Sequence, residues 1–211
     1  MKYDYIIWDF NGTLLDDVQA GIDSVNTLLA EREMPIIESV EKYREVFRFP
    51  IIDYYRALGF DFDKESYEEL APKWVSLYLT NVKKAFLYDD VLRTLDYVCE
   101  QGITQTVLSA TEHTMLCGQI NELGIEHYFD ELLGLDNIHA CSKLAIARDW
   151  RERHSNARVL FIGDTDHDVE TAETLGADCI LVARGHQGKA YLESLGVPVV
   201  ETLDKVVELV K

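Results

Sequence analysis

Basic residues are scarce in this sequence of 211 residues: 20 lysines and arginines stand against 38 aspartates and glutamates, a formal net charge of −18. Nucleic acids and anionic membrane surfaces both require a basic patch, so we expect neither as a partner. The acidic excess also disfavours an anionic ligand. A bound divalent cation and a few local basic groups would have to reverse the field, which is possible because buried site charges outweigh screened surface charges.

Cysteines are few and form no close pair of the metal-ligand kind: Cys99, Cys117, Cys141 and Cys179 are widely scattered. We expect reduced structural thiols in a cytoplasmic protein. No apolar run reaches the roughly 18 residues that a membrane span needs. The N-terminus leads into an apolar segment without the pattern of a secretory signal, so we expect none. Hydrophobic residues at 47% and charged residues at 27% are typical of a globular chain.

Short apolar runs without strict alternation are typical of strands buried on both faces of a parallel sheet. They are Tyr5–Trp8, Thr104–Leu108, Leu132–Leu135, Val159–Ile162, Cys179–Val182 and, more weakly, Val197–Val200. Between them lie helical patterns: Val91–Glu100, Thr114–Leu123, Leu144–Arg153 and Val169–Leu175. This alternation of strand and helix predicts an α/β fold with a doubly wound parallel sheet.

The interval from Leu15 to Tyr88 breaks the alternation, because it contains no convincing strand and its apolar spacing is helical. Breaks occur at Pro35, Pro50 and Pro72. Connections in βα units are usually short, so this interval is best explained as an inserted unit. We predict an all-helical cap domain over 15–88 and a core domain formed by 1–14 and 89–211.

Polar clusters follow successive predicted strands. The first runs from Asp9 to Thr13, the second begins at Ser109, the third contains Lys143 in an Ala-Cys-Ser-Lys segment, and the fourth is Gly163–Asp168. Ligands of open α/β sheets bind at the carboxyl ends of the strands. Phosphoryl transfer to a carboxylate needs a nucleophile, donors for the phosphoryl oxygens, a cation and acidic ligands for Mg²⁺.

The first cluster, Asp9-Phe-Asn11-Gly-Thr13, resembles the nucleophile loop of the haloacid dehalogenase superfamily, most members of which are Mg²⁺-dependent phosphatases. The four clusters match the four motifs of that superfamily in order, and the helical interval resembles the cap of its phosphoglycolate-phosphatase and phosphoglucomutase branch. The resemblance implies a Rossmann-like core. It also implies that Asp9 is the nucleophile and a Mg²⁺ ligand, that the backbone carbonyl of Asn11 is a second ligand, and that Thr13 binds substrate.

The remaining motifs imply further roles. Ser109 and Lys143 resemble the hydroxyl and ammonium groups that bind the phosphoryl group, and Lys143 counts as catalytic. Asp164 resembles the acidic Mg²⁺ ligand. Asp168 resembles the residue that holds a metal-bound water or the lysine. Two details depart from the frequent pattern: no Pro follows Lys143, and Ala-Thr rather than Asn-Lys follows Ser109.

Each cluster also has a purely structural interpretation. Asn-Gly is a common turn dipeptide, and Ser109 could cap the helix that follows it. The aspartates of 163–168 could stabilise a helix N-terminus, each by roughly 0.3–1 kcal/mol. Lys143 is unfavourable at a helix N-terminus by itself, so its position predicts a nearby anion. His113 and His167 are expected at the surface. The four structural explanations would have to coincide at four strand ends, which favours the functional interpretation.

Asn11 stands where phosphatases of this superfamily carry an aspartate that protonates the leaving oxygen and helps to deprotonate the attacking water. An amide neither gives nor takes a proton at useful pH. General acid–base catalysis typically contributes about 10²–10⁴-fold, and alkyl phosphates, with very basic leaving groups, depend on it most.

Three hypotheses follow from Asn11. The chain could be a phosphatase that is slow or takes its proton from another group, among them Asp16, Asp17, His113 or Tyr54, although Asp16 is better explained as a helix N-cap. It could act on activated phosphates or another electrophile. It could instead have lost turnover and bind Mg²⁺ and a phosphorylated ligand as a regulatory protein.

The otherwise complete set of residues favours retained chemistry. A receiver-like domain, which accepts phosphate on an aspartate as a signal, fits less well because such a domain is compact and lacks a cap. We therefore expect a cytoplasmic, Mg²⁺-dependent hydrolase, monomeric or homodimeric, acting on a small phosphorylated metabolite through an aspartyl phosphate on Asp9. In the cap, Arg44, Arg48 and Tyr54 lie near Phe49-Pro50 and could meet the distal end of the substrate.

Overall fold

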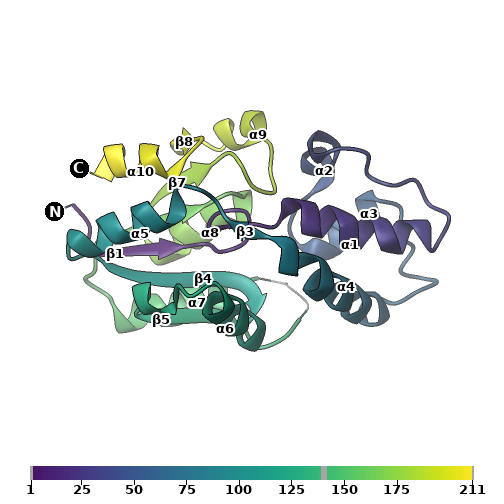
Figure 1. Ribbon diagram of the computed structural model, residues 1–211, viewed down its shortest axis with the longest axis horizontal. Helices are drawn as coiled ribbons and strands as arrows, with labels where there is room; N and C mark the ends of the chain where they lie inside the picture. Colours follow the sequence, from purple (N-terminus) through teal and green to yellow (C-terminus); the bar gives the residue numbers. More distant parts are fainter. Residues whose placement is uncertain (1, 139–141, 211) are drawn as a thin grey trace.

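A six-stranded, entirely parallel sheet forms the centre of the protein, in the order β5-β4-β1-β6-β7-β8 (Figure 1). The computed structural model describes residues 2–138 and 142–210. The strands are β1 (Tyr5–Trp8), β4 (Thr104–Glu112), β5 (Glu131–Leu135), β6 (Val159–Gly163), β7 (Asp178–Val182) and β8 (Val199–Val200). The central position of β1 between β4 and β6 brings the residues that follow it to the middle of the carboxyl edge of the sheet.

Helices cover both faces of the sheet, because successive side chains of β1 point to opposite faces and both sets are apolar. Ile6 and Trp8 pack into one hydrophobic cluster, with residues of α5 (Val91–Glu100), α6 (His113–Glu122) and α10 (Leu203–Val210). Ile7 points to the opposite face and packs with residues of α7 (Leu144–Arg153) and α8 (Asp166–Leu175). Two short helices, η2 (Glu126–Tyr128) and α9 (Lys189–Glu193), complete the core. The predicted doubly wound α/β fold is confirmed.

Most element boundaries agree with the sequence-based predictions within a few residues. The bounds of β1, α5 and α7 are identical to the predicted ones. The predicted strand Thr104–Leu108 continues to Glu112, and α8 begins at Asp166 rather than at Val169. The earlier start of α8 has a local cause. Thr165 and Asp168 form a capping box, in which each side chain binds the backbone of the other residue.

The segment between β1 and α5 is almost entirely helical. It contains α1 (Val18–Ala30), α2 (Val40–Val46), α3 (Ile51–Ala57), α4 (Tyr67–Asn81) and η1 (Val82–Lys84), here called the helical insert. Two strands of two residues each, β2 (Leu15–Asp16) and β3 (Phe86–Leu87), pair antiparallel where the chain leaves and re-enters the core. The sequence did not reveal these strands, because two residues carry no readable periodicity.

The helical insert has a hydrophobic cluster of its own, built on the buried faces of α1, α3 and α4. In Figure 1 the insert lies at the right, beyond the end of the sheet toward which β1 runs, and both termini lie at the left. The division into a core of 1–14 and 89–211 and a cap of 15–88 remains a proposal. None of the described helices has the length and apolarity that a membrane span requires.

Candidate active site

Asp9 directly follows the central strand β1 and lies against Lys143. The Lys143 Nζ atom is 2.5 Å from Asp9 Oδ1 and 2.6 Å from Asp168 Oδ1, and it donates a third hydrogen bond to the Leu108 carbonyl at 3.2 Å. The side chain of Lys143 is 2% exposed. Burial alone would lower the pKa of this lysine, but Asp168 and Asp9 outweigh burial and raise it. The anion expected near Lys143 is thus a pair of carboxylates.

Asp168 connects Lys143 to the start of α8. Its Oδ2 atom accepts hydrogen bonds from the backbone N–H groups of Asp164 and Thr165, both at 2.9 Å, and from Thr165 Oγ1 at 2.8 Å. Burial opposes its charge, but Lys143 and Thr165 outweigh burial and lower the pKa of the carboxyl group. Asp168 is therefore an anion that both positions Lys143 and caps a helix. Its functional and its structural interpretation both apply.

Asp9, Asp164 and Asp168 form a buried group of carboxylates whose nearest oxygens lie within 4.8 Å of one another. Burial raises the pKa of Asp9 well above its usual value and that of Asp164 to about 6. Thr13 Oγ1 and the His186 backbone N–H donate to the two oxygens of Asp164, at 3.2 and 2.6 Å. Three buried carboxylates with one lysine leave an excess of negative charge. Carboxylate oxygens are the ligands that Mg²⁺ prefers, so these residues fit a divalent cation.

Lys143→Met is expected to destabilise the protein in metal-free buffer by about 3 kcal/mol, because breaking a buried ion pair leaves uncompensated charge. Urea unfolding measures the effect. Lys189→Met is the matched control, since Lys189 is half exposed and its ion pairs with Glu193 and Glu201 lie at the surface. Equal stability losses in the two variants would show that the carboxylates do not depend on Lys143.

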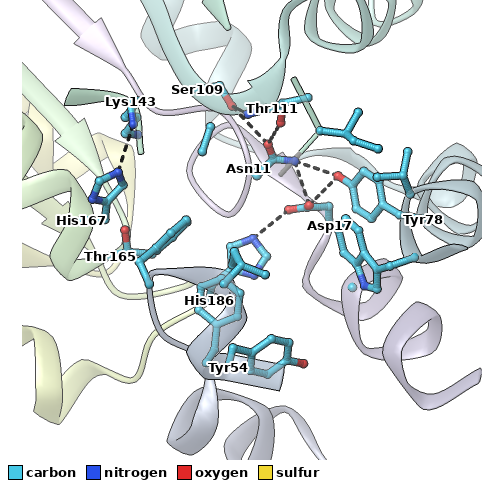
Figure 2. A pocket seen from close by; sticks show the side chains of 18 of the residues that line it. Asn11, Asp17, Tyr54, Tyr78, Ser109, Thr111, Lys143, Thr165, His167 and His186 are labelled. Atoms are coloured by element: carbon cyan, nitrogen blue, oxygen red, sulfur yellow. Dashed lines mark hydrogen bonds and ion pairs between the residues drawn. The ribbon is translucent and has the colours of Figure 1, made fainter. Parts of the chain in front are cut away.

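Asn11 makes four hydrogen bonds through its side-chain amide. Its Nδ2 atom donates to Asp17 Oδ2 at 2.9 Å and to the Tyr78 hydroxyl at 2.7 Å. Its Oδ1 atom accepts from Thr111 Oγ1 at 2.7 Å and from Ser109 Oγ at 3.4 Å. Figure 2 shows Asn11 between these two pairs of partners. An amide satisfies both sides at once, whereas a carboxylate would face Asp17 with like charge.

Asp17 is the N-cap residue of α1, so the prediction that Asp16 caps this helix was wrong. Asp16 is exposed in β2, where it pairs with Phe86. Asp17 is 2% exposed, and its carboxylate accepts from the Gly12 N–H at 2.9 Å besides Asn11. The sequence could not separate these neighbours, since either aspartate precedes the helix.

His186 is a site residue that sequence reasoning missed. It follows β7, and its Nε2 atom lies 3.3 Å from Asp17 Oδ1 while its Nδ1 atom is hydrogen-bonded to the Tyr43 hydroxyl at 2.7 Å. Burial alone would lower its pKa, but Asp17 outweighs burial and raises it to about 9. Its place at a strand end was the available signal. Tyr43, Tyr78 and Thr111 gave no such signal.

Ser109 and His113 both lie near the start of α6. Ser109 does not cap α6; Glu112 does, by accepting from the N–H groups of Thr114 and Met115. Ser109 Oγ instead accepts from the Thr111 N–H at 3.1 Å and points to Asn11. His113 is exposed, as expected.

His167 was expected at the surface but is 4% exposed. Its ring stacks on Phe49 from the helical insert, with 4.8 Å between ring centroids, and its Nε2 atom accepts from the Lys143 N–H at 3.3 Å. Burial of His167 thus depends on a contact with a distant segment of the chain. The Ala-Cys part of the segment before Ser142 lies outside the described residues, whereas Cys99, Cys117 and Cys179 are free thiols as expected.

A pocket lies between the helical insert and the carboxyl edge of the sheet. Asp9 and Lys143 line it from the core, and aromatic residues such as Phe47 and Trp74 line it from the insert. Figure 2 shows this pocket from close by, with Lys143 and His167 on one side and Asn11, Asp17 and Tyr78 on the other. The site therefore combines a buried carboxylate, a positioned ammonium group and a pocket beside them.

The sequence profile of the haloacid dehalogenase-like hydrolases matches residues 6–182. The chain belongs to this family. The family resemblance expected from the motifs is therefore confirmed, as is the assignment of the chain as an enzyme of the hydrolase class.

Individual relatives of this hydrolase are consistent with the family assignment. The phosphoglycolate phosphatase of Pseudomonas savastanoi pv. phaseolicola is 23% identical over 213 residues, covering 96% of this chain and 78% of that protein. The phosphoglycolate phosphatase of Rhodobacter capsulatus is 23% identical over 195 residues, covering 90% and 88%. A haloacid dehalogenase-like family hydrolase of known structure from Streptococcus pneumoniae is 19% identical, with a TM-score of 0.83 and coverage of 100% and 99%. That structural likeness shows the fold.

Proposed function

We propose that this haloacid dehalogenase-like hydrolase is a Mg²⁺-dependent phosphatase that forms an aspartyl phosphate on Asp9. The observation that carries the proposal is the placement of Asp9: a carboxylate at the end of the central strand, held by Lys143 and grouped with Asp164. The relatives named as phosphoglycolate phosphatases support a small phosphorylated metabolite as substrate.

The residues of the site have separate roles in this proposal. Asp9 attacks phosphorus. Lys143 and Ser109 bind the phosphoryl oxygens. Thr13, whose hydroxyl group donates a hydrogen bond to Asp164, also binds the substrate. Lys143 also offsets part of the negative charge of the carboxylate cluster, which favours the approach of an anionic group.

The metal site would be formed by Asp9, the backbone carbonyl of Asn11 and Asp164, with Asp168 behind them holding Lys143. Mg²⁺, when bound, supplies positive charge for the phosphoryl oxygens in a water-excluded site. The acidic surface of the chain then does not prevent binding of an anionic substrate, because the local charges of the site dominate.

The helical insert acts in this proposal as a cap. Arg44 ties it to the core, since its guanidinium donates to the backbone carbonyls of Gly185 at 2.8 Å and Arg184 at 2.5 Å. Closure of such a cap excludes water from the phosphoryl group. A cytoplasmic location and a monomeric or homodimeric state remain predictions.

Phosphate release is expected to require Mg²⁺. Chelation with EDTA should lower release by at least about 10²-fold, and added Mg²⁺ should restore it, because three buried carboxylates would otherwise repel the substrate. Mg²⁺ at 100 times its dissociation constant should also stabilise the fold by about 2.7 kcal/mol. Asp164→Asn should remove both effects, whereas Asp166→Asn should retain both. Release unaffected by EDTA would contradict the proposal.

The second candidate is a weak or inactive regulatory protein that binds Mg²⁺ and a phosphorylated ligand. One observation favours it: the amide of Asn11 is fully hydrogen-bonded and built into its surroundings, which is a stable alternative to a catalytic acid. Binding of phosphate with Mg²⁺, without release from any phosphorylated compound, would support this candidate over the enzyme.

A further inference from the structure

The wall that the helical insert presents to the pocket is mainly aromatic. Phe47 stacks on the ring of His186, with 4.9 Å between centroids, and Phe49 stacks on His167 at 4.8 Å. Trp74 lies parallel to Tyr78, with centroids 4.8 Å apart and an interplanar angle of 15°. All of these rings line the same pocket as Asp9. Phe47, Phe49 and Trp74 are only partly buried, so they have surface left to contact a ligand.

Two tyrosine hydroxyl groups of this wall are already used within the protein, whereas the buried hydroxyl group of Tyr54 has no hydrogen-bond partner among the described residues. The Tyr43 hydroxyl is hydrogen-bonded to His186, and the Tyr78 hydroxyl donates to Asp17 at 2.7 Å and accepts from Asn11. What these tyrosines offer a ligand is therefore the ring and not the hydroxyl group. Flat apolar surfaces of this kind favour an aromatic partner.

The pocket has no uncommitted cation for a second anionic group among residues 2–138 and 142–210. The basic side chains that line it are Lys143, His167 and His186. Lys143 lies against Asp9 and Asp168, where it serves the phosphoryl group, and each histidine has a carboxylate partner of its own.

The two cap arginines expected to meet the substrate lie elsewhere. Arg44 binds backbone carbonyls of the core, and the exposed Arg48 donates to the Val46 carbonyl at 3.0 Å. Glu112 and Asp17 also line the pocket. A carboxylate at the distal end of a substrate would therefore meet acidic groups and no free partner, which disfavours phosphoglycolate itself.

Asn11 points independently to the same class of leaving group. Asn11 cannot protonate the departing oxygen, and a leaving group that is stable as an anion does not need that proton. A phenol has a pKa of about 10, as in tyrosine. Water is a far weaker acid than a phenol, and alcohols resemble water more than they resemble phenols. An aryl oxide is therefore a far better unprotonated leaving group than an alkoxide.

We propose that the substrate is a small aryl phosphate, with the aromatic ring against Phe47, Phe49 and Trp74 and the phosphoryl group at Asp9; this rests on the phosphatase function proposed above. A carboxylate oxygen of Asp9 forms a bond to phosphorus. The bond from phosphorus to the aryl oxygen breaks, the electron pair leaves with that oxygen, and the aryl oxide takes a proton from solvent. Water then attacks phosphorus, the bond to Asp9 breaks, and the water proton passes to the phosphate or to solvent.

The test compares kcat/KM of the natural chain, with Mg²⁺, for phenyl phosphate, 2-naphthyl phosphate, acetyl phosphate, 2-phosphoglycolate and a phosphotyrosyl peptide. We expect phenyl phosphate to exceed 2-phosphoglycolate by at least about 10²-fold, because the acid is missing. We expect the second ring of naphthyl phosphate to add roughly tenfold through further apolar contact. Acetyl phosphate is activated but small, so it should fall below both aryl phosphates.

Phe49→Ala tests the wall itself. It should lower the naphthyl-to-acetyl ratio of kcat/KM about tenfold, whereas Phe86→Ala, at a phenylalanine that is 74% exposed on β3, should leave the ratio unchanged. A preference for 2-phosphoglycolate or acetyl phosphate would overturn the aryl proposal and leave the phosphatase intact. A preference for the phosphotyrosyl peptide would overturn the small-molecule assignment. No phosphate release from any compound would overturn the phosphatase function as well.

Discussion

Asp9→Asn should lower phosphate release by at least about 10⁴-fold, since an amide cannot act as the attacking carboxylate and removal of a nucleophile commonly has effects of this size. The shape of the side chain is kept, and an amide oxygen can still accept from Lys143. The thermal midpoint should therefore stay within a few degrees. Removing one of three clustered negative charges also relieves the repulsion that contributes to the raised pKa of Asp9.

The matched control is Asp16→Asn, the same change at an exposed residue of β2. It should leave phosphate release within about twofold. The measurement is phosphate release over several turnovers, in the presence of Mg²⁺, for both variants. Full activity in Asp9→Asn would remove Asp9 from the chemistry.

Asn11→Asp should produce the largest gain. The new carboxylate would face Asp17 Oδ2 where Nδ2 now lies 2.9 Å away, so one of the two groups must hold a proton. A carboxyl group kept protonated beside the nucleophile is a general acid. We expect kcat/KM for 2-phosphoglycolate to rise by about 10²–10³-fold and kcat/KM for phenyl phosphate to change less than tenfold, because kcat/KM reports the first step, in which an aryl oxide leaves without help.

The same substitution should also destabilise the fold by about 1–3 kcal/mol, since it replaces a donor to Asp17 and Tyr78 by an acceptor. Asn121→Asp, at an exposed position of α6, controls for the added charge. Initial rates for the two substrates and urea unfolding give both readouts. An equal loss of turnover for both substrates would mean that the amide itself is needed for catalysis.

The core of this fold is predictable from sequence because its strands are buried on both faces. The run Ile6-Ile7-Trp8 is fully buried between β4 and β6, and a continuous apolar run is the pattern that such a position requires. The rule that sites form at the carboxyl ends of parallel strands then brings Asp9 together with Lys143, although they are far apart in the chain.

The surroundings of Asn11 were not predictable in the same way. They depend on how the helical insert is oriented on the core, which no periodicity encodes. Tyr78 reaches Asn11 from α4, and Tyr43 reaches His186 from α2. The same dependence explains the error at His167, which is buried by Phe49. Contacts between the helical insert and the core are set by the tertiary arrangement, and a single sequence does not reveal it.

The most direct test of the account is a rapid-quench experiment with phenyl phosphate, Mg²⁺ and the natural chain. Asn11 cannot deprotonate the water that attacks the aspartyl phosphate, so the second step should be slower than the first. We predict a burst of phenol close to one equivalent per enzyme, with a phosphoryl group found by mass spectrometry on the peptide that contains Asp9. Steady phosphate release without a burst and without phosphorylated Asp9 would contradict the account.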